Sequence, residues 1–217
     1  MRLSKIIRQA RNGELKALSP GDKTDEVVID YINLAMIALY SKFQLKTDEA
    51  IIELSSARTL YKLNGEDTAV RVDGQIKTED DVMQLIGAYD EKGPIAINNE
   101  HEPYSIYQTS YNTVQVPMPE DGAYVGIIYK AGPEDIVYTD SGDGSANDQE
   151  VALPMQLLEA LLHYVGYRAH GSLDGAIDAE NNTHLMRFKA SCDEAIRNGV
   201  IPADSLEMTN DRKGFVL

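Results

Sequence analysis

Apolar residues dominate residues 154–170, PMQLLEALLHYVGYRAH, around most of a helical turn. The polar residues of this stretch recur at steps of three or four, with Gly166 filling the one longer gap, so they share a narrow helical stripe. They are Gln156, Glu159, His163 and His170. A helix that rests on a single core carries a narrower apolar face. The pattern therefore predicts a helix that is buried on more than one side.

We expect the two apolar sides of this helix to have different partners. The side assigned to the core of the same subunit holds Leu158, Leu162, Val165 and Ala169. The other side, which would complete a larger core or meet a neighbouring subunit, holds Leu157, Leu161 and Tyr164. Uncovered apolar surface on a monomer marks an interaction site, so these three residues are candidate interface residues.

Residues 1–12 predict a short helix with one apolar face and a basic remainder. The basic residues recur at every third position: Arg2, Lys5, Arg8 and Arg11. Such a face is solvated or docked on the chain's own acidic surface, or else it contacts an acidic partner or a phosphate backbone. Because a contact with an acidic partner or a phosphate backbone is possible, these four residues are candidate interface residues as well.

A longer helix is predicted from Thr24 or Asp25 to about Phe43. Its apolar residues form two adjacent rows at helical spacing. One row is Val28, Ile32, Ala35, Leu39 and Phe43, and the other is Val27, Tyr31, Leu34 and Ala38. Asn33 lies between the rows, where we expect its amide to bond backbone groups of the preceding loop.

From Thr47 onward the apolar period changes to two, which predicts strands. We expect eight short strands: 50–54 paired with 59–63, then 82–89, 94–97, 105–109, 113–117, 123–129 and 136–138. The residues Asp90-Glu91-Lys92-Gly93 are typical of a hairpin loop. A last helix is predicted over about 178–198.

The predicted fold is α+β: a helical bundle, made of N-terminal helices and a C-terminal helical hairpin, interrupted by a β-rich insertion. The expected ranges are 1–46 and 150–200 for the bundle, 47–140 for the insertion, 141–149 for an acidic linker and 201–217 for a C-terminal tail. The tail has a basic pair, Arg212 and Lys213, before Phe215, Val216 and Leu217. We expect these three apolar residues to dock on a partner. An undocked, frayed end is the alternative.

The net charge narrows the range of functions. The chain of 217 residues has a formal charge of −15, which opposes general affinity for nucleic acid. No apolar run reaches the length of a membrane span, and the N-terminus lacks the apolar core of a signal peptide. We therefore expect no membrane association. The one cysteine, Cys192, excludes an internal disulfide.

The residues that could carry catalysis or bind a metal form no recognisable site. Cys192 lies on the apolar stripe of its helix, which favours a core residue over a nucleophile. His163 and His170 are seven residues apart, whereas paired helical metal ligands are usually three or four apart. Calcium-loop, phosphate-loop and nucleophile-elbow motifs do not occur. We expect no enzyme, no metal and no cofactor.

Two stretches resemble a known family. The opening, RLSKIIRQARNGELKAL followed by DEVVIDYINLAMIALYSKF, is similar to the N-terminal region of head-to-tail adaptor (connector, neck) proteins of tailed bacteriophages. The segments NNEHEPYSIYQTSYNTVQVP, LPMQLLEALLHYVGYRAH and LMRFKASCDEAI resemble the rest of such proteins, over about residues 1–200. The motif residues are Asp25, Glu26, Tyr31, Ile32, Asn33 and Ala35. A tryptophan expected before the second helix is missing.

The resemblance implies a structural virion protein that forms a homo-oligomeric ring, expected to be twelvefold, beneath the portal protein. The ring would contact a tail or nozzle protein and extend the channel through which double-stranded DNA leaves without specific binding. The implied location is the virion neck, after synthesis in the cytoplasm of the bacterial host. The alternatives are a head-completion or tail-terminator ring, an acidic DNA mimic or regulatory binding protein, and an enzyme of unfamiliar design.

Overall fold

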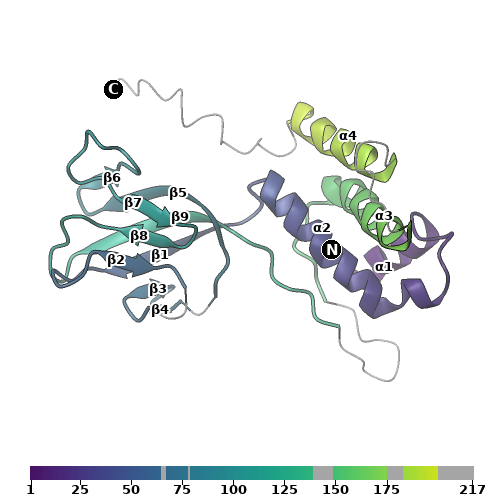
Figure 1. The fold of residues 1–217 in the computed structure, drawn as a ribbon, viewed down its shortest axis with the longest axis horizontal. Coiled ribbons are helices and arrows are strands. Elements are labelled where there is room, and N and C mark those ends of the chain that lie inside the picture. Colours follow the sequence, from purple (N-terminus) through teal and green to yellow (C-terminus); the bar gives the residue numbers. More distant parts are fainter. Residues whose placement is uncertain (65–66, 78, 139–148, 175–182, 200–217) are drawn as a thin grey trace. The chain divides into compact units, whose positions relative to one another are not determined.

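The computed structural model describes residues 1–64, 67–77, 79–138, 149–174 and 183–199 (Figure 1). It combines α-helices with antiparallel β-sheets, which confirms the α+β class. The chain divides into two compact units. Residues 1–44 and the described residues from 133 onward form the helical unit, and residues 45–132 form the strand unit.

The helical unit draws its elements from both ends of the sequence. These are α1 (Leu3–Asn12), η1 (Gly21–Lys23), α2 (Asp25–Lys42), η2 (Met155–Leu157), α3 (Leu158–Asp174) and α4 (Thr183–Arg197). α1 and α2 each pack against α3, and α4 packs against α3 as well. α3 is thus the central helix of this unit.

Local sequence signals set the first two helices. α1 buries Leu3, Ile6, Ile7 and Ala10, which are spaced as one helical face. At the start of α2 the Thr24 hydroxyl accepts a hydrogen bond from the Val27 N–H at 3.4 Å, as the predicted N-cap requires. Asp25 and Glu26 in the first turn of α2 and Lys42 in its last turn complement the helix dipole.

The N-terminus pairs with the backbone that precedes α3. The Met1 amino group donates to the Val151 carbonyl at 2.8 Å, and the Val151 N–H donates to the Met1 carbonyl at 2.7 Å. The Leu3 N–H donates to the carbonyl of Gln149, the last residue of the expected acidic linker, at 3.0 Å. Residues 141–148 of that linker lie outside the described residues.

Asn33 also bridges distant segments. Its amide donates to the Ile136 carbonyl and accepts from the Ile136 N–H, both at 3.0 Å. Asn33 therefore bonds backbone groups, as predicted, but the prediction of where these groups lie in the chain is wrong. Both partner groups belong to Ile136, 103 residues away, rather than to the preceding loop. The strand predicted at 136–138 does not form.

The strand unit consists of two antiparallel sheets (Figure 1). The six-stranded sheet has the order β4-β3-β1-β9-β5-β6, and the three-stranded sheet has the order β2-β8-β7. The strands are β1 (Thr47–Glu53), β2 (Leu60–Lys62), β3 (Val70–Val72), β4 (Gln75–Ile76), β5 (Val82–Asp90), β6 (Gly93–Ile95), β7 (Tyr107–Ser110), β8 (Thr113–Gln115) and β9 (Tyr124–Ala131).

One apolar core joins the two sheets. β1 contributes Ala50 and Ile52 from its inward face, and Tyr61 and Val114 contribute from the smaller sheet. The predicted pairing of 50–54 with 59–63 is wrong, because β1 pairs with β3 and β9 while β2 pairs with β8. Strands that are adjacent in a sequence often form a hairpin, and this tendency underlies the predicted pairing. Instead, the chain crosses from one sheet to the other after β1, and β2 belongs to the smaller sheet.

The turn between β5 and β6 follows its sequence signature. The Asp90 carboxylate accepts hydrogen bonds from the backbone N–H groups of Lys92 and Gly93, at 2.7 and 3.0 Å. Gly93 has a φ of 133°, a backbone conformation that side-chain-bearing residues rarely adopt. The predicted hairpin is confirmed, and it holds Asp90, Glu91 and Lys92 together at one end of the unit.

Candidate functional site

The central helix α3 does not expose the residues that the sequence assigned to a neighbour. Leu157, in the η2 turn just before α3, and Leu161 are fully buried within the protomer, with no exposed surface. Leu158 and Leu162, expected to face the core, are only partly buried. The expected division of the helix is therefore reversed for these four leucines. The reason is that α1, α2 and α4 together cover a wide arc of α3, so that one protomer suffices to bury Leu157 and Leu161.

Tyr164 also has partners inside the helical unit. Its ring meets the Phe188 ring of α4 edge to face, with centroids 5.0 Å apart, and the Tyr167 ring at 5.6 Å. Edge-to-face pairs of this kind stabilise helix packing. Tyr164 is half-buried, so it contributes to the α3–α4 contact and keeps some exposed surface.

The four basic residues of the N-terminal helix have different roles. Arg11 forms an ion pair with Asp25 at 2.5 Å, and its Nε donates to the Lys23 carbonyl at 2.8 Å. It ties the end of α1 to the start of α2. Arg2, Lys5 and Arg8 are exposed. Within the described residues, the side chains of Lys5 and Arg8 have no hydrogen bond or ion pair, so these two present open positive charge.

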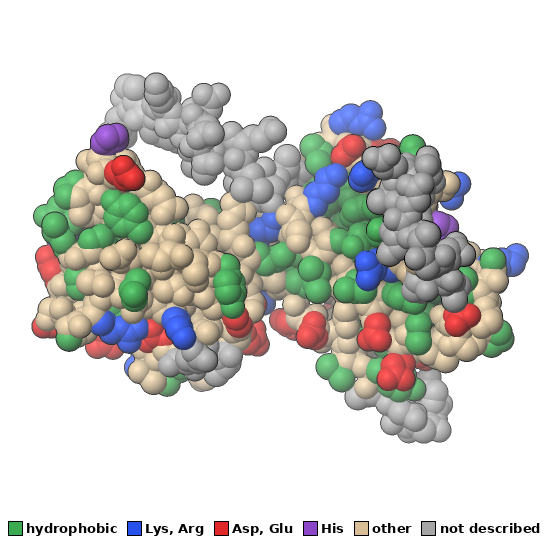
Figure 2. Space-filling view, in the orientation of Figure 1, with side chains coloured by type: hydrophobic (Ala, Val, Ile, Leu, Met, Phe, Trp, Pro, Cys, Tyr) green, Lys and Arg blue, Asp and Glu red, His purple; other side chains and the backbone are tan. Residues whose placement is uncertain are grey.

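An apolar face of α2 is exposed that the sequence analysis did not assign to an interface. Leu34 is 37% exposed and Ile37 is 45% exposed, one helical turn apart, and Val27, Tyr31 and Ala38 beside them are half-buried. Figure 2 shows apolar side chains reaching the surface among charged ones on this unit. The sequence did contain the signal, because the second apolar row of this helix has no charged residue between Tyr31 and Ala38.

Three of the four histidines gather around Glu14, just after α1. The Glu14 carboxylate lies 3.1 Å from His163 Nδ1 and 2.7 Å from His184 Nδ1, and the Glu14 carbonyl oxygen lies 2.9 Å from His170 Nε2. The rings of His170 and His184 stack at 4.9 Å. Gly166 makes room, since a Cβ there would lie 2.8 Å from His184 Nδ1.

This cluster joins three segments of the helical unit through polar contacts. Burial lowers the pKa of His184 below its ordinary value. The charges of His170 and Arg187 act in the same direction, and the Glu14 carboxylate opposes them. Among the described residues, no group of three or more histidine, cysteine or acidic side chains has a geometry that could hold a metal ion. The arrangement therefore supports a structural, pH-sensitive contact between helices.

Cys192 is buried in the contact of α4 with its neighbours. Burial raises the pKa of its thiol to about 11. A thiol of this kind is a weak nucleophile at neutral pH, so the interpretation of Cys192 as a core residue agrees with its surroundings.

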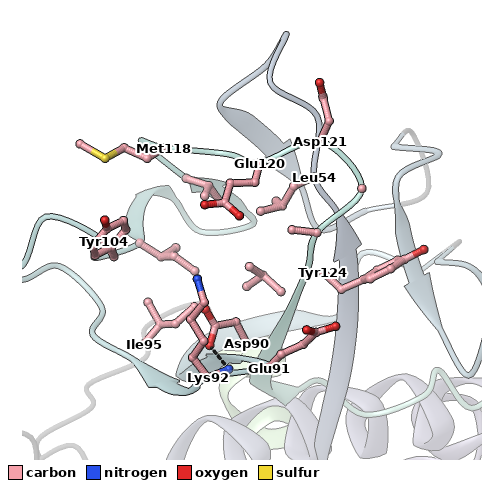
Figure 3. Close-up of a pocket in the computed structure, with 15 residues that line it drawn as sticks. Leu54, Asp90, Glu91, Lys92, Ile95, Tyr104, Met118, Glu120, Asp121 and Tyr124 are labelled. Atoms are coloured by element: carbon pink, nitrogen blue, oxygen red, sulfur yellow. Dashed lines mark hydrogen bonds between the residues drawn. The ribbon is translucent and has the colours of Figure 1, made fainter.

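The strand unit contains a hollow of about 340 Å³ at the end that carries the β5–β6 turn (Figure 3). Its floor is apolar and largely buried, and is formed by Leu54, Ile106, Val116 and Val125. Exposed Tyr104, Met118 and Tyr124 flank it. Four carboxylates belong to its lining: Asp90 and Glu91 from the turn, and Glu120 and Asp121 from the loop before β9. Lys92 is the one cationic residue of the lining.

The loop before β9 is fixed by hydrogen bonds. The Asp121 carboxylate accepts from the Ser56 N–H at 2.5 Å and from the Ser56 hydroxyl at 2.7 Å. These bonds lower the pKa of Asp121, which keeps the group ionised at neutral pH. Glu91 and Glu120 make no hydrogen bond or ion pair with another described residue. Their charges remain available to a cationic partner.

Three candidate interface residues, Phe215, Val216 and Leu217, lie outside the described residues, as does the rest of the 201–217 segment. Within the described part of the chain, no helix is long and apolar enough to span a membrane.

Comparison with protein families identifies the family of this chain. A search of curated proteins finds no match. The family model of the SU10 adaptor protein matches residues 1–209, nearly the whole chain. This match confirms the resemblance to phage head-to-tail adaptors and supports a structural component of a phage virion that contacts portal and tail proteins. Enzymatic activity is not typical of such a family. The chain belongs to the SU10 adaptor protein family.

Proposed function

We propose that this protein is the subunit of a homo-oligomeric ring, expected to be twelvefold, that joins the portal to the tail or nozzle at the virion neck. The ring extends the exit channel for double-stranded DNA. The subunit is made in the cytoplasm of the bacterial host and acts without catalysis or cofactor. The family assignment supports an adaptor, and the open apolar face of α2 is the observation that supports a ring.

The α2 face has the properties of a subunit contact. Leu34 and Ile37 present large apolar side chains to solvent in the single subunit. Burying apolar side chains of this size contributes about 1.5–3 kcal/mol each, and a ring repeats the contact at each subunit. We propose that this face, rather than Leu157 and Leu161, carries the contact with a neighbouring subunit, together with the exposed part of Tyr164.

The charges of the subunit fit the same proposal. A formal charge of −15 disfavours binding of DNA to the wall of the channel. The exposed basic residues Arg2, Lys5 and Arg8 are then the part of the helical unit suited to an acidic surface of the portal or of a neighbour. In this proposal the helices of 1–46 and 150–200 form one bundle, and the insertion 47–140 presents the strand unit to further partners.

Native mass spectrometry of the protein, alone and mixed with its portal protein, tests the proposal. We expect a closed ring of defined mass in the mixture. The double variant Leu34→Lys/Ile37→Lys should remain folded, because both side chains are already exposed in the subunit. It should stay monomeric, because the proposed subunit contact then carries two like charges.

Met186→Lys is the matched control, since Met186 is an exposed apolar residue of the same unit, on α4. It should assemble normally. A wild-type chain that stays monomeric with the portal, or that binds a DNA-binding protein instead, would contradict the ring and favour an acidic mimic.

A further inference from the structure

The hollow in the strand unit has the chemistry of a site for a short peptide segment that is both basic and apolar. Its volume of about 340 Å³ falls within the range of ligand pockets. Its floor is apolar, and exposed aromatic and methionine side chains flank it. In Figure 3, Glu120 lies beside Leu54 above the hollow, and Asp90 and Glu91 lie below it. A segment that enters between them meets negative charge from both sides.

The chain itself has one segment that matches this chemistry. Arg212-Lys213 is the only pair of adjacent basic residues in the sequence, and the apolar residues Phe215, Val216 and Leu217 follow after one glycine. The other basic cluster of the chain belongs to α1, whose apolar residues are already buried. Residues 212–217 are therefore the segment of this protein best suited to the hollow.

We propose that residues 212–217 of one copy bind in the hollow of the strand unit of a second copy. Phe215 contacts the apolar floor beside Leu54 and Val125, and Arg212 and Lys213 pair with Glu91 and Glu120. This proposal rests on the proposed ring, because it names a contact between neighbouring subunits. It also supplies an attraction between copies whose net charges of −15 repel each other.

Disulfide trapping between two distinguishable chains tests the proposal. One chain carries a tag and Met118→Cys at the flank of the hollow, and the other carries Val216→Cys. The native Cys192 is buried in both and stays unreactive. Under mild oxidation, alone and with the portal protein, we expect a disulfide-linked heterodimer.

Three control variants make this result specific. Replacing Met118→Cys by Ile76→Cys, at an exposed position of β4 that does not line the hollow, should give no heterodimer above background. Adding Glu91→Lys/Glu120→Lys to the tagged chain should lower the yield on the order of tenfold, with a strong dependence on salt. The matched pair Glu49→Lys/Glu79→Lys reverses exposed acids outside the hollow and should leave the yield unchanged.

Two results would overturn the proposal. No disulfide under either condition would mean that the hollow does not receive this segment. A chain carrying both Met118→Cys and Val216→Cys that forms only an internal disulfide would assign the segment to its own strand unit. If the ring assembles by native mass spectrometry while the trapping fails, this inference alone falls. If no ring forms with the portal, the proposed function falls as well.

Discussion

Helices α2 and α3 share an apolar sequence pattern but differ in how much of their apolar surface is buried. Both are apolar around much of their circumference. In α3 the apolar residues Leu161 and Val165 are completely covered by α1, α2 and α4. In α2 one side buries Ile32 and Leu39, while Leu34 and Ile37 on another side stay exposed. An apolar pattern on several sides therefore predicts several contacts, but it does not show which contacts lie within one subunit.

The difference arises from the position of each helix in the chain's own packing. α3 lies at the centre of the helical unit, so the protomer provides neighbours on most sides. α2 packs against α3 and α1 but keeps Leu34 and Ile37 exposed. The exposed apolar surface that we propose as a subunit contact is therefore on α2.

The largest expected effect belongs to the covered face of α3. Leu161→Asp places a charge where no surface is exposed, and it should destabilise the protomer by at least about 3 kcal/mol. Thermal unfolding monitored by circular dichroism should show a large loss of melting temperature or no cooperative transition. A variant that unfolds like the wild type and fails only to assemble would restore Leu161 to the subunit interface.

The second effect concerns the polar contact of α2. Asn33→Leu removes both hydrogen bonds to Ile136 and leaves its backbone N–H and carbonyl without these partners. We expect a loss of roughly 1–3 kcal/mol despite the more apolar side chain. Asn12→Leu, at an exposed position of α1, is the control. An unchanged melting temperature of Asn33→Leu would show that the bridge to Ile136 contributes nothing.

The histidine cluster that holds α3 and α4 to Glu14 gives a smaller, pH-dependent effect. His184 has a lowered pKa in the folded protein, so the unfolded chain binds more protons near and below its ordinary pKa of 6.5. Stability should therefore fall as the pH decreases through this region. Melting temperatures measured between pH 7.5 and 5.5 should decrease, and His184→Gln should reduce the slope.

The control for this pH effect is His101→Gln, because His101 is exposed in a loop of the strand unit. It should keep the wild-type slope. If the His184→Gln variant retains the full pH dependence, other groups of the helical unit are responsible.

The smallest effect on stability concerns the basic residues of α1, which differ in whether they form an ion pair. Lys5→Glu/Arg8→Glu changes exposed charges without partners and should leave the melting temperature nearly unchanged, since exposed pairs contribute only about 0.2–1 kcal/mol. Binding to the portal should weaken, more at low salt than at high salt. Arg11→Glu should instead lower stability, because Arg11 pairs with Asp25. Equal effects of both changes on melting would contradict this division.

The sequence predicted the features that depend on local chemistry. The Thr24 cap, the helical spacing of α1 and α2 and the hairpin turn at Asp90–Gly93 all follow from short-range signals. Short-range signals do not predict which distant segments pair with each other. The Asn33 amide was expected to bond backbone, but nothing in its neighbourhood indicates Ile136, and nothing near Glu14 indicates three histidines. The acidic hollow likewise combines residues of several separate segments, from Leu54 to Val125.

The central claim is that the open face of α2 becomes covered in the assembled ring. Thiol labelling of a Leu34→Cys variant, as the free subunit and after assembly with the portal protein, measures this directly. We predict fast labelling in the free subunit and strong protection in the ring. A Leu161→Cys variant, whose position is buried in the protomer, should be protected in both states. Equally fast labelling of Leu34→Cys before and after assembly would contradict the claim.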